Sequence, residues 1–330
     1  MRKETKFVLI SFGAGGGYCH TEMSCKERSM SSLGSSKHWP STMTGDSLIS
    51  SDPEENKDFY SWNHVFIPYC CGDLHTGQRR SPNEWGLFFA GHFTIKTVIS
   101  NLLNTSNLEQ AKVVMLSGGS AGGIGAFEHA DFFSESLHWA EVKSVPIGGY
   151  FFPDNMTEYA LWLQNKTEPP RNRSLYDMYH SFTQAECTAE NSDNPQLCGP
   201  ANIGFLYSYI KTPLYVAENQ YDSNQIFAQL GCPHKLEADV VRYVKYYGNL
   251  MRSALRGIKN SPKHDGLFGP SCLDHTGNLD KIYDSPKVNN CSFGQSLGNW
   301  YFNRSGTCDK QLMDDCGNLP CNHSPGCKTT

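Results

Sequence analysis

The sequence of 330 residues predicts an α/β fold, in which a mostly parallel β-sheet carries helices on both faces. Two observations favour this fold. Short apolar runs alternate along the chain with longer segments of helical periodicity, and glycine-rich stretches directly follow two of the apolar runs. Because the chain shows no internal repeat and no long linker, we expect a single domain over residues 1–330.

The expected strands and helices follow from the spacing of apolar residues. Short runs of mainly apolar residues predict strands at 6–12, 64–69, 112–116, 142–147 and 213–218. Apolar residues near helical spacing predict helices at 91–103, 124–137 and 237–256. The last of these helices has a single apolar stripe, which we expect to lie in the core; its members are Val240, Val244, Tyr247, Met251 and Leu255.

Two segments lack this regular pattern. Residues 155–202 are rich in Pro, Asn and charged residues and include Cys187 and Cys198, and we expect them to form an insertion near the functional site. Residues 290–330 are polar and dense in cysteine, which predicts a loop-dominated C-terminal region held by disulfides.

Charge and hydropathy argue against two classes of protein. The net charge is −5, and the pair Arg79 and Arg80 is too short to be a basic stripe, so we expect no nucleic-acid partner. No apolar run approaches the length of a membrane span, so we expect no transmembrane segment. We expect the protein to be a monomer.

Thirteen cysteines and seven N-x-Ser/Thr sequons indicate a secreted glycoprotein with disulfides. The alternative is a cytosolic zinc protein, but the paired C-x2-C spacing of zinc ribbons occurs nowhere, so we expect neither a metal nor another cofactor. The sequons are at Asn104, Asn155, Asn165, Asn172, Asn290, Asn303 and Asn322.

The opening sequence MRKETKFVLISF has basic residues and an apolar stretch too short for a signal peptide. Because its apolar part also has the pattern of a core strand, we expect the true N-terminus to be truncated or misassigned. The odd cysteine count fits a lost upstream partner and fits a free thiol equally well.

The stretch LSGGSAGGIGAF, residues 116–127, predicts a catalytic serine. It lacks the glycine spacing of a dinucleotide fingerprint and the lysine of a phosphate-binding loop. It matches G-x-S-x-G, in which Ser120 lies between Gly118 and Gly122. This motif is the nucleophile elbow of α/β-hydrolases, a strained turn between a strand and a helix that exposes the serine hydroxyl.

A serine nucleophile needs a histidine base and an acid that orients the histidine, and in α/β-hydrolases both follow the serine in the chain. Asp222 lies just after the predicted strand at 213–218, with Glu218 as a neighbouring candidate and Asp154 as the main rival. His275 lies in a glycine-bounded loop after the long helix, where the base is expected.

The oxyanion that forms during ester hydrolysis needs two backbone N–H donors. The residue after the nucleophile, Ala121, supplies one of them. The loop FGAGGGYC, after the first predicted strand, offers Gly16, Gly17 and Tyr18 for the other.

At these residues the chain resembles the family that joins plant pectin acetylesterases to the animal carboxylesterase Notum. GGGYC is similar to the family's GGGWC, with Tyr18 where tryptophan is usual, and LSGGSAGG is similar to the nucleophile segment. Further similar segments, in the same order, are PEEN, FIPYC, QYDSNQI, PSCLDH, DSPKVNN, GNWYF and the cysteine-rich end. The residues after His275 match neither branch well.

The resemblance implies an α/β-hydrolase fold with Ser120 as nucleophile, Asp222 as acid and His275 as base, and it decides against Asp154. It implies Gly17, Tyr18 and Ala121 around the oxyanion. We therefore expect a secreted serine carboxylesterase whose substrate is an acetylated polysaccharide. Two alternatives stay open: removal of a fatty acyl group from a lipidated secreted protein, and a non-catalytic module that binds glycan or lipid.

Overall fold

The computed structural model describes residues 6–152, 175–230, 238–263, 265–284, 286–317 and 319–328. The contacts between residues group the chain into two compact units. The first unit contains the described residues of 1–45, 62–153 and 172–212, and the second contains 46–61 and the described residues from 213 onward. The single domain over residues 1–330 stays a prediction.

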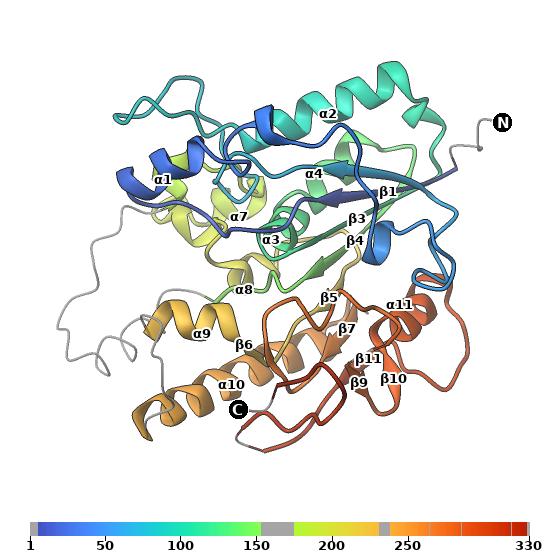
Figure 1. Cartoon of the computed structure of the whole chain (residues 1–330). Helices are drawn as coiled ribbons and strands as arrows, with labels where there is room; N and C mark the ends of the chain where they lie inside the picture. Colours follow the sequence, from blue (N-terminus) through green and yellow to red (C-terminus); the bar gives the residue numbers. More distant parts are fainter. Residues whose placement is uncertain are drawn as a thin grey trace. The chain divides into compact units, whose positions relative to one another are not determined.

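Four parallel strands form the sheet of the first unit (Figure 1). Their order is β4, β3, β1 and β2, so that β1 and β3 lie in the middle, with most of their side chains buried. This burial is typical of parallel sheets, because helices cover both faces. The bounds are Phe7–Phe12 for β1, Asn63–Ile67 for β2, Val113–Gly119 for β3 and Glu141–Ile147 for β4. All four overlap predicted strands.

The helix α2 (Gly91–Thr105) packs on this sheet through one apolar face. Its Ile95 and Ile99 belong to the same buried cluster as Val8 of β1 and Val114 of β3. Each side chain that is fully buried in such a cluster contributes about 1.5–3 kcal/mol to the free energy of unfolding. The other helices of this unit are α1 (Glu22–Ser29), α3 (Ala121–Glu128), α4 (Ala130–Ser136), α6 (Leu175–Tyr179), α7 (Ala185–Glu190) and α8 (Ile203–Leu206), with short 3₁₀ turns at Ser36–His38, Leu108–Gln110 and Pro195–Cys198.

The helix predicted at 124–137 differs from the structure in two ways. It begins earlier, at Ala121, and it divides at His129 into α3 and α4. His129 ends α3, and its backbone, with φ −100° and ψ 2°, leaves the helical conformation. Its ring Nδ1–H donates to the Gly125 carbonyl at 2.9 Å, and its Nε2 accepts from His92 Nδ1 at 3.1 Å, so buried hydrogen bonds fix the break.

Of the insertion expected at 155–202, residues 155–174 lie outside the described part of the chain. The remainder forms α6, α7 and the 3₁₀ turn, and the Cys187–Cys198 disulfide closes it. The Tyr179 hydroxyl donates a hydrogen bond to the Cys19 carbonyl at 2.5 Å, which ties this segment to the glycine-rich loop after β1.

The second unit has its own three parallel strands, in the order β11, β7 and β5. The strand β5 (Tyr215–Ala217) lies within the run predicted at 213–218, whereas β7 (Gly266–Gly269) and β11 (Gln311–Met313) were not predicted. Its helices are α9 (Ser223–Leu230), α10 (Ala238–Lys259) and α11 (Phe293–Phe302), with a 3₁₀ turn at Ser47–Ile49. Its short two-strand pairs are β6 (Tyr221–Asp222) with β8 (Leu273–Asp274), and β9 (Lys287–Val288) with β10 (Cys291–Ser292).

Five disulfides join ten described cysteines, and three of them stabilise the C-terminal region as predicted. The three are Cys272–Cys327, Cys291–Cys308 and Cys316–Cys321. Together with the parallel strands and their covering helices, they confirm the predicted α/β architecture with a cysteine-rich end.

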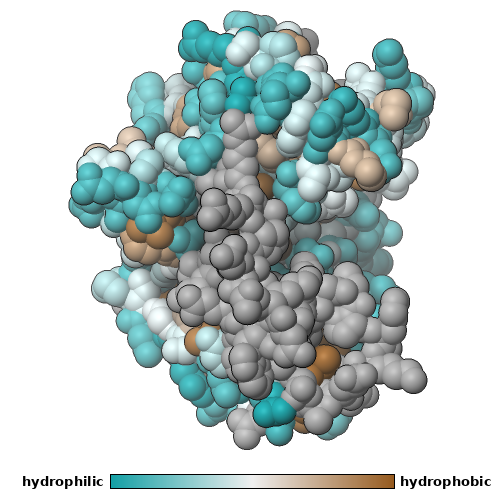
Figure 2. Space-filling model, turned by 90° about the vertical axis from the view of Figure 1, so that its left-hand side faces the viewer, coloured by the Kyte–Doolittle hydropathy of each residue, from teal (hydrophilic) through white to brown (hydrophobic). Residues whose placement is uncertain are grey.

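None of the helices in the described ranges combines the length and the hydropathy that crossing a bilayer would require. The described surface turned towards the viewer in Figure 2 is mainly hydrophilic, with scattered apolar side chains.

Glu128, the last residue of α3, is a buried carboxyl without a hydrogen bond in the described structure. Burial raises its pKa well above the ordinary value, because a charged carboxylate is poorly solvated there. A group of this kind stabilises the fold most below its unfolded pKa of about 4.3. That contribution is lost as the pH rises through the raised pKa.

We therefore expect that Glu128→Gln, which cannot ionise, removes the loss of folding stability that ionisation of Glu128 causes at higher pH. Between about pH 5 and about pH 8 the free energy of unfolding should fall less in the variant than in the parent. Denaturant titrations at both pH values measure it. Glu109→Gln, at an exposed position, is the control and should keep the parent's pH dependence. An equal pH dependence in Glu128→Gln and the parent would contradict the expectation.

Candidate active site

Ser120 lies at the sharp turn between β3 and α3, in the first unit. Its backbone has φ 56° and ψ −119°, a conformation that non-glycine residues rarely adopt and that is typical of strained functional residues. Its N–H donates to the Ile147 carbonyl at 2.9 Å, and its own carbonyl accepts from Ile124 at 3.0 Å. The elbow expected from the sequence is therefore present in its geometry.

The glycines around Ser120 are required by close backbone packing. A Cβ at Gly122 would lie 2.3 Å from the Phe12 carbonyl oxygen, and a Cβ at Gly118 would lie 2.5 Å from the Gly122 oxygen. Real Cβ atoms do not approach other atoms so closely, so a side chain at either position would push α3 away from β1. The helix α3 begins at Ala121, directly after the serine. The N–H groups of its first turn, including that of Ala121, have no hydrogen-bond partner within the helix.

The glycine-rich loop after β1 contains the other two predicted oxyanion residues, Gly17 and Tyr18. Gly15, Gly16 and Gly17 all have positive φ, at 107°, 70° and 54°, so the loop follows a path that side chains would strain. Tyr18 is 42% exposed. The loop and Ala121 belong to the same unit, and the start of the loop packs on the elbow, because the Gly13 oxygen lies 3.0 Å from a Cβ at Gly122.

Two polar side chains that the sequence analysis did not identify hold this loop. Arg28 donates from Nη1 to the Gly16 carbonyl at 2.5 Å, and its guanidinium lies 4.9 Å from the centroid of the Tyr69 ring. His75 is buried, which lowers its pKa to about 4, so the ring is neutral and its Nε2–H donates to the Gly13 carbonyl at 3.1 Å. Neither residue lies in a recognisable motif, so only the fold reveals these contacts.

Asp222 and His275 meet in the second unit, as the sequence analysis expected for the acid and the base. Asp222 Oδ2 lies 2.6 Å from His275 Nδ1, and the Asp222 side chain is fully buried. The short strands β6 and β8 bring the two together, because Asp222 is paired in register with Asp274. A carboxylate only accepts hydrogen bonds, so Nδ1 carries the proton and Nε2 is left as a proton acceptor.

The charge of His275 is set by opposing effects. Burial lowers its pKa, but the hydrogen bond that the ring donates to Asp222 and the negative charges of Asp222, Asp274 and Asp280 outweigh burial, so the pKa lies above its ordinary value. The other acid considered, Glu218, is also buried in this unit, but Asp222 is the acid that accepts the hydrogen bond of the His275 ring. The rival Asp154 lies outside the described residues.

The backbone of the His275 loop is held by asparagines that the sequence analysis did not single out. Asn219 donates from its amide to the His275 carbonyl and to the Asn278 side chain, both at 2.8 Å. Asp274 accepts from the backbone N–H groups of His275 and Asn278, at 2.8 and 3.0 Å. These bonds fix the path of the chain on both sides of the imidazole.

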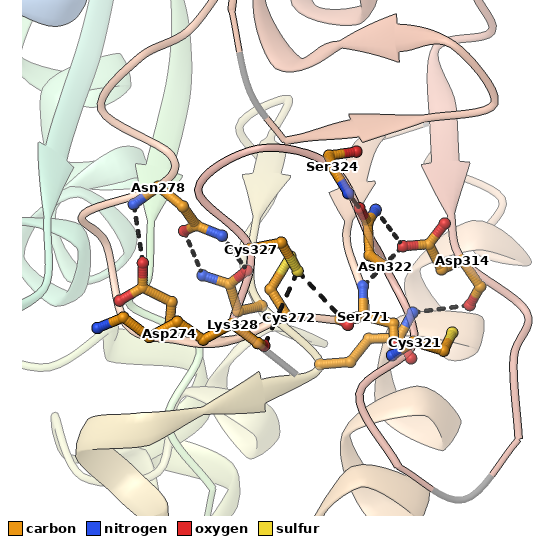
Figure 3. Close-up of a disulfide and its surroundings, with 12 residues drawn as sticks. Ser271, Cys272, Asp274, Asn278, Asp314, Cys321, Asn322, Ser324, Cys327 and Lys328 are labelled. Atoms are coloured by element: carbon orange, nitrogen blue, oxygen red, sulfur yellow. Dashed lines mark hydrogen bonds between the residues drawn. A yellow bond between two sulfur atoms is a disulfide. The ribbon is translucent and has the colours of Figure 1, made fainter. Parts of the chain in front are cut away.

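Residues near the C-terminal end hold the start of the same loop through a disulfide and hydrogen bonds (Figure 3). The Cys272–Cys327 disulfide lies three residues before His275, and the Leu273 N–H donates to the Lys328 carbonyl at 2.8 Å. Asp314, the residue after β11, accepts a hydrogen bond from the Ser271 N–H at 2.8 Å. This bond anchors Ser271, which precedes Cys272, to the end of β11. A disulfide and several hydrogen bonds therefore fix the start of the histidine loop.

A family model for pectinacetylesterases matches residues 3–327 of the chain. The chain belongs to this family. Among its relatives, pectin acetylesterase 5 of Arabidopsis thaliana is 29% identical, over 94% of this chain and 74% of the relative. The palmitoleoyl-protein carboxylesterase notum1a of Danio rerio is 27% identical, over 99% of this chain and 67% of the relative.

The structure is similar to that of the Wnt deacylase Notum from Drosophila, with a TM-score of 0.81 and 25% identity over 98% of this chain and 91% of that chain. The resemblance stated from the sequence and the α/β-hydrolase-like fold are thus confirmed. Membership in the pectinacetylesterase family makes the protein a carboxylic-ester hydrolase, as expected.

The hydrogen bond between Asp222 and His275 in this member of the pectinacetylesterase family predicts how the pKa of His275 depends on Asp222. We expect Asp222→Asn to lower the pKa of His275, because the carboxylate that stabilises the imidazolium is removed while burial remains. NMR titration of the His275 ring measures the change. Asp280→Asn is the matched control and should lower the pKa less, since Asp280 contributes less than Asp222. An unchanged His275 titration in Asp222→Asn would contradict the prediction.

Proposed function

We propose that the protein is a secreted serine esterase that removes O-acetyl groups from a polysaccharide, with Ser120, Asp222 and His275 as its catalytic triad. The single observation that carries this proposal is the 2.6 Å hydrogen bond between Asp222 and His275 Nδ1. It leaves Nε2 as a base of the kind that a serine nucleophile needs. The strained elbow at Ser120 supports the other half of the mechanism.

In this mechanism His275 Nε2 accepts the proton of the Ser120 hydroxyl as the serine oxygen attacks the ester carbonyl. The backbone N–H of Ala121 and those of Gly17 and Tyr18 stabilise the tetrahedral oxyanion. The sugar alcohol leaves with the proton from His275, and an acetyl-enzyme remains. Water, deprotonated by His275, then attacks the acetyl group, and the serine recovers its proton as acetate leaves.

Asp222 orients the imidazole and stabilises its positive charge during both steps. Since the base must be neutral to accept a proton, activity rises with pH through the raised pKa of His275.

Secretion is supported by the disulfides. Ten of the described cysteines are paired, and disulfides persist in oxidising compartments, not in the cytosol. The sequons at Asn104, Asn290 and Asn303 lie at exposed positions, as glycosylation in the secretory pathway requires. The sequon at Asn322 does not, because that side chain is buried and its amide nitrogen donates to Lys287 and Asp314.

The polysaccharide substrate is supported by the relatives that carry the name pectin acetylesterase, two of which are 29% identical to this chain. A second candidate, removal of a fatty acyl group from a secreted protein, is favoured by the similarity to the Drosophila Wnt deacylase, with its TM-score of 0.81. The two activities share the triad and differ in the acyl group that the site accepts.

The mechanism predicts that Ser120→Ala abolishes ester hydrolysis. We expect kcat for 4-nitrophenyl acetate to fall by about 10⁴-fold or more, because the nucleophile is removed. A fluorophosphonate probe should label the parent at Ser120 and leave the variant unlabelled. Ser117→Ala, at a buried serine of β3, is the control for labelling and should retain the probe. If Ser120→Ala keeps its activity, Ser120 is not the nucleophile and the proposed triad is wrong. If the parent neither hydrolyses the ester nor reacts with the probe, the protein is a non-catalytic binding module.

The size of the acyl group gives a separate prediction. We expect kcat/KM to be higher for 4-nitrophenyl acetate than for 4-nitrophenyl octanoate, because an acetyl group needs only a shallow site and a long chain needs a deep apolar one. Steady-state rates with both esters measure the ratio. A preference for octanoate would reject the acetyl assignment and support the fatty-acyl candidate, while leaving the triad in place.

A further inference from the structure

A polar cavity of about 320 Å³ lies in the second unit, at α11 and the loop that follows it. None of its lining residues belongs to the proposed triad or to the oxyanion loop. Two of the segments that resemble the family contribute to its surroundings: the residues just after PEEN, and GNWYF. The lining residues are Lys57, Asp58, Tyr283, Gln295, Asn299, Arg304, Gly306, Thr307 and Cys308.

A rigid frame holds the walls of this cavity. Asp58 accepts from Arg304 Nη2 at 2.7 Å and from the Tyr283 hydroxyl at 2.9 Å. Asn299 donates from its amide to the Cys308 carbonyl at 2.7 Å, and the Cys291–Cys308 disulfide ties that residue to the start of α11. The cavity is thus formed by side chains whose positions are already fixed.

The charge of the lining is positive, although the whole chain carries −5. Asp58 is matched by Arg304 in an ion pair, which leaves the exposed ammonium of Lys57 without a partner among the described carboxylates. The Lys57 Nζ lies 5.4 Å from the centroid of the Tyr283 ring, so a positive charge and an aromatic face lie side by side.

Unused hydrogen-bond donors accompany this charge. The described bonds of the Arg304 side chain use one guanidinium nitrogen, towards Asp58, and a guanidinium has five N–H groups. Gln295 uses its oxygen to accept from the Ser292 N–H at 2.9 Å, so its amide N–H₂ group stays available. The side-chain oxygen of Asn299 supplies an acceptor, since its nitrogen is engaged by Cys308.

We propose that this cavity binds the carboxylate-bearing sugar ring of an acidic glycan. Lys57 and the outer guanidinium nitrogens of Arg304 contact the carboxylate, Gln295 and Asn299 bind hydroxyls, and the Tyr283 ring packs against the apolar face of the sugar. The cavity lies at the lower end of the range of about 300–1,000 Å³ typical of small-molecule sites, a size suited to a single sugar ring.

Each alternative ligand leaves part of the lining unused. A fatty acyl chain would cover the Lys57 ammonium and the outer guanidinium N–H groups of Arg304 without offering them an acceptor, which is unfavourable once water is displaced. A simple inorganic anion would use the cations but neither the aromatic face nor the amide acceptor. An acidic sugar uses all of them.

This site goes beyond the proposed function, because it binds the glycan without taking part in ester hydrolysis. Its test uses the full chain with Ser120→Ala, so that binding is measured without turnover and stands or falls independently of the triad. Isothermal titration calorimetry with trigalacturonate and with a hyaluronan tetrasaccharide compares two sources of sugar carboxylate. Galactotriose, which lacks the carboxylate, is the neutral comparison.

We expect at least one acidic oligosaccharide to bind, with affinity that falls as salt is added, and galactotriose to bind more weakly. In this background Lys57→Glu should weaken binding by about tenfold or more, because an attraction becomes a repulsion. Lys57→Gln, which removes only the charge, should weaken it less. Lys112→Glu is the matched control, since it makes the same change at an exposed lysine outside the cavity.

Thermal unfolding of each variant shows that the fold is retained. The proposal is overturned if neither acidic oligosaccharide binds, if galactotriose binds equally well, or if Lys57→Glu and Lys112→Glu have the same effect. Binding of only one acidic oligosaccharide supports the site and identifies which uronate it prefers.

Discussion

The structure around Ser120, the proposed nucleophile, depends on one constraint, the close approach of the start of α3 to the end of β1. A Cβ at Gly122 would lie 2.3 Å from the Phe12 carbonyl oxygen, so the backbones themselves are in contact there. This contact leaves Ser120 no relaxed path between strand and helix, and its φ of 56° follows. Strain of this kind persists only where the surrounding packing determines the backbone, and the buried cluster of β1, β3 and α2 does so here.

The proposed acid and base are held in a different way. Asp222 ends the two-residue strand β6, and His275 directly follows the two-residue strand β8, so the strand pairing at this site is short. A network of hydrogen bonds compensates, in which Asn219 and Asn278 exchange amide bonds and Asp274 accepts two backbone N–H groups. Such networks are strong only when every member is satisfied, so the loss of a single amide here disturbs several contacts at once.

Apolar patterning was sufficient to predict the five longer strand regions and the helices α2 and α10, because each buries one continuous apolar face. It missed β7, which contains two glycines in four residues, and it missed the break at His129, which depends on a tertiary hydrogen bond to His92. Ser120 could be proposed from a local motif, and His275 from its place in a glycine-bounded loop after the long helix; both stay candidates. The supports of the site, Arg28 and Asn219 among them, act across distant parts of the sequence and have no local signal. The pairing of cysteines is equally non-local.

The Cys272–Cys327 disulfide has a consequence for the synthesis of the protein. During translation His275 emerges from the ribosome well before Cys327, which is 55 residues after its partner. The strand β11 and the segment that fastens Ser271 also follow later. The histidine loop therefore cannot be cross-linked when it is first synthesised. It reaches its final form only after Cys327 has been made and has been oxidised to a disulfide with Cys272. The turn at Ser120 is therefore complete in the growing chain before the loop of His275 is cross-linked.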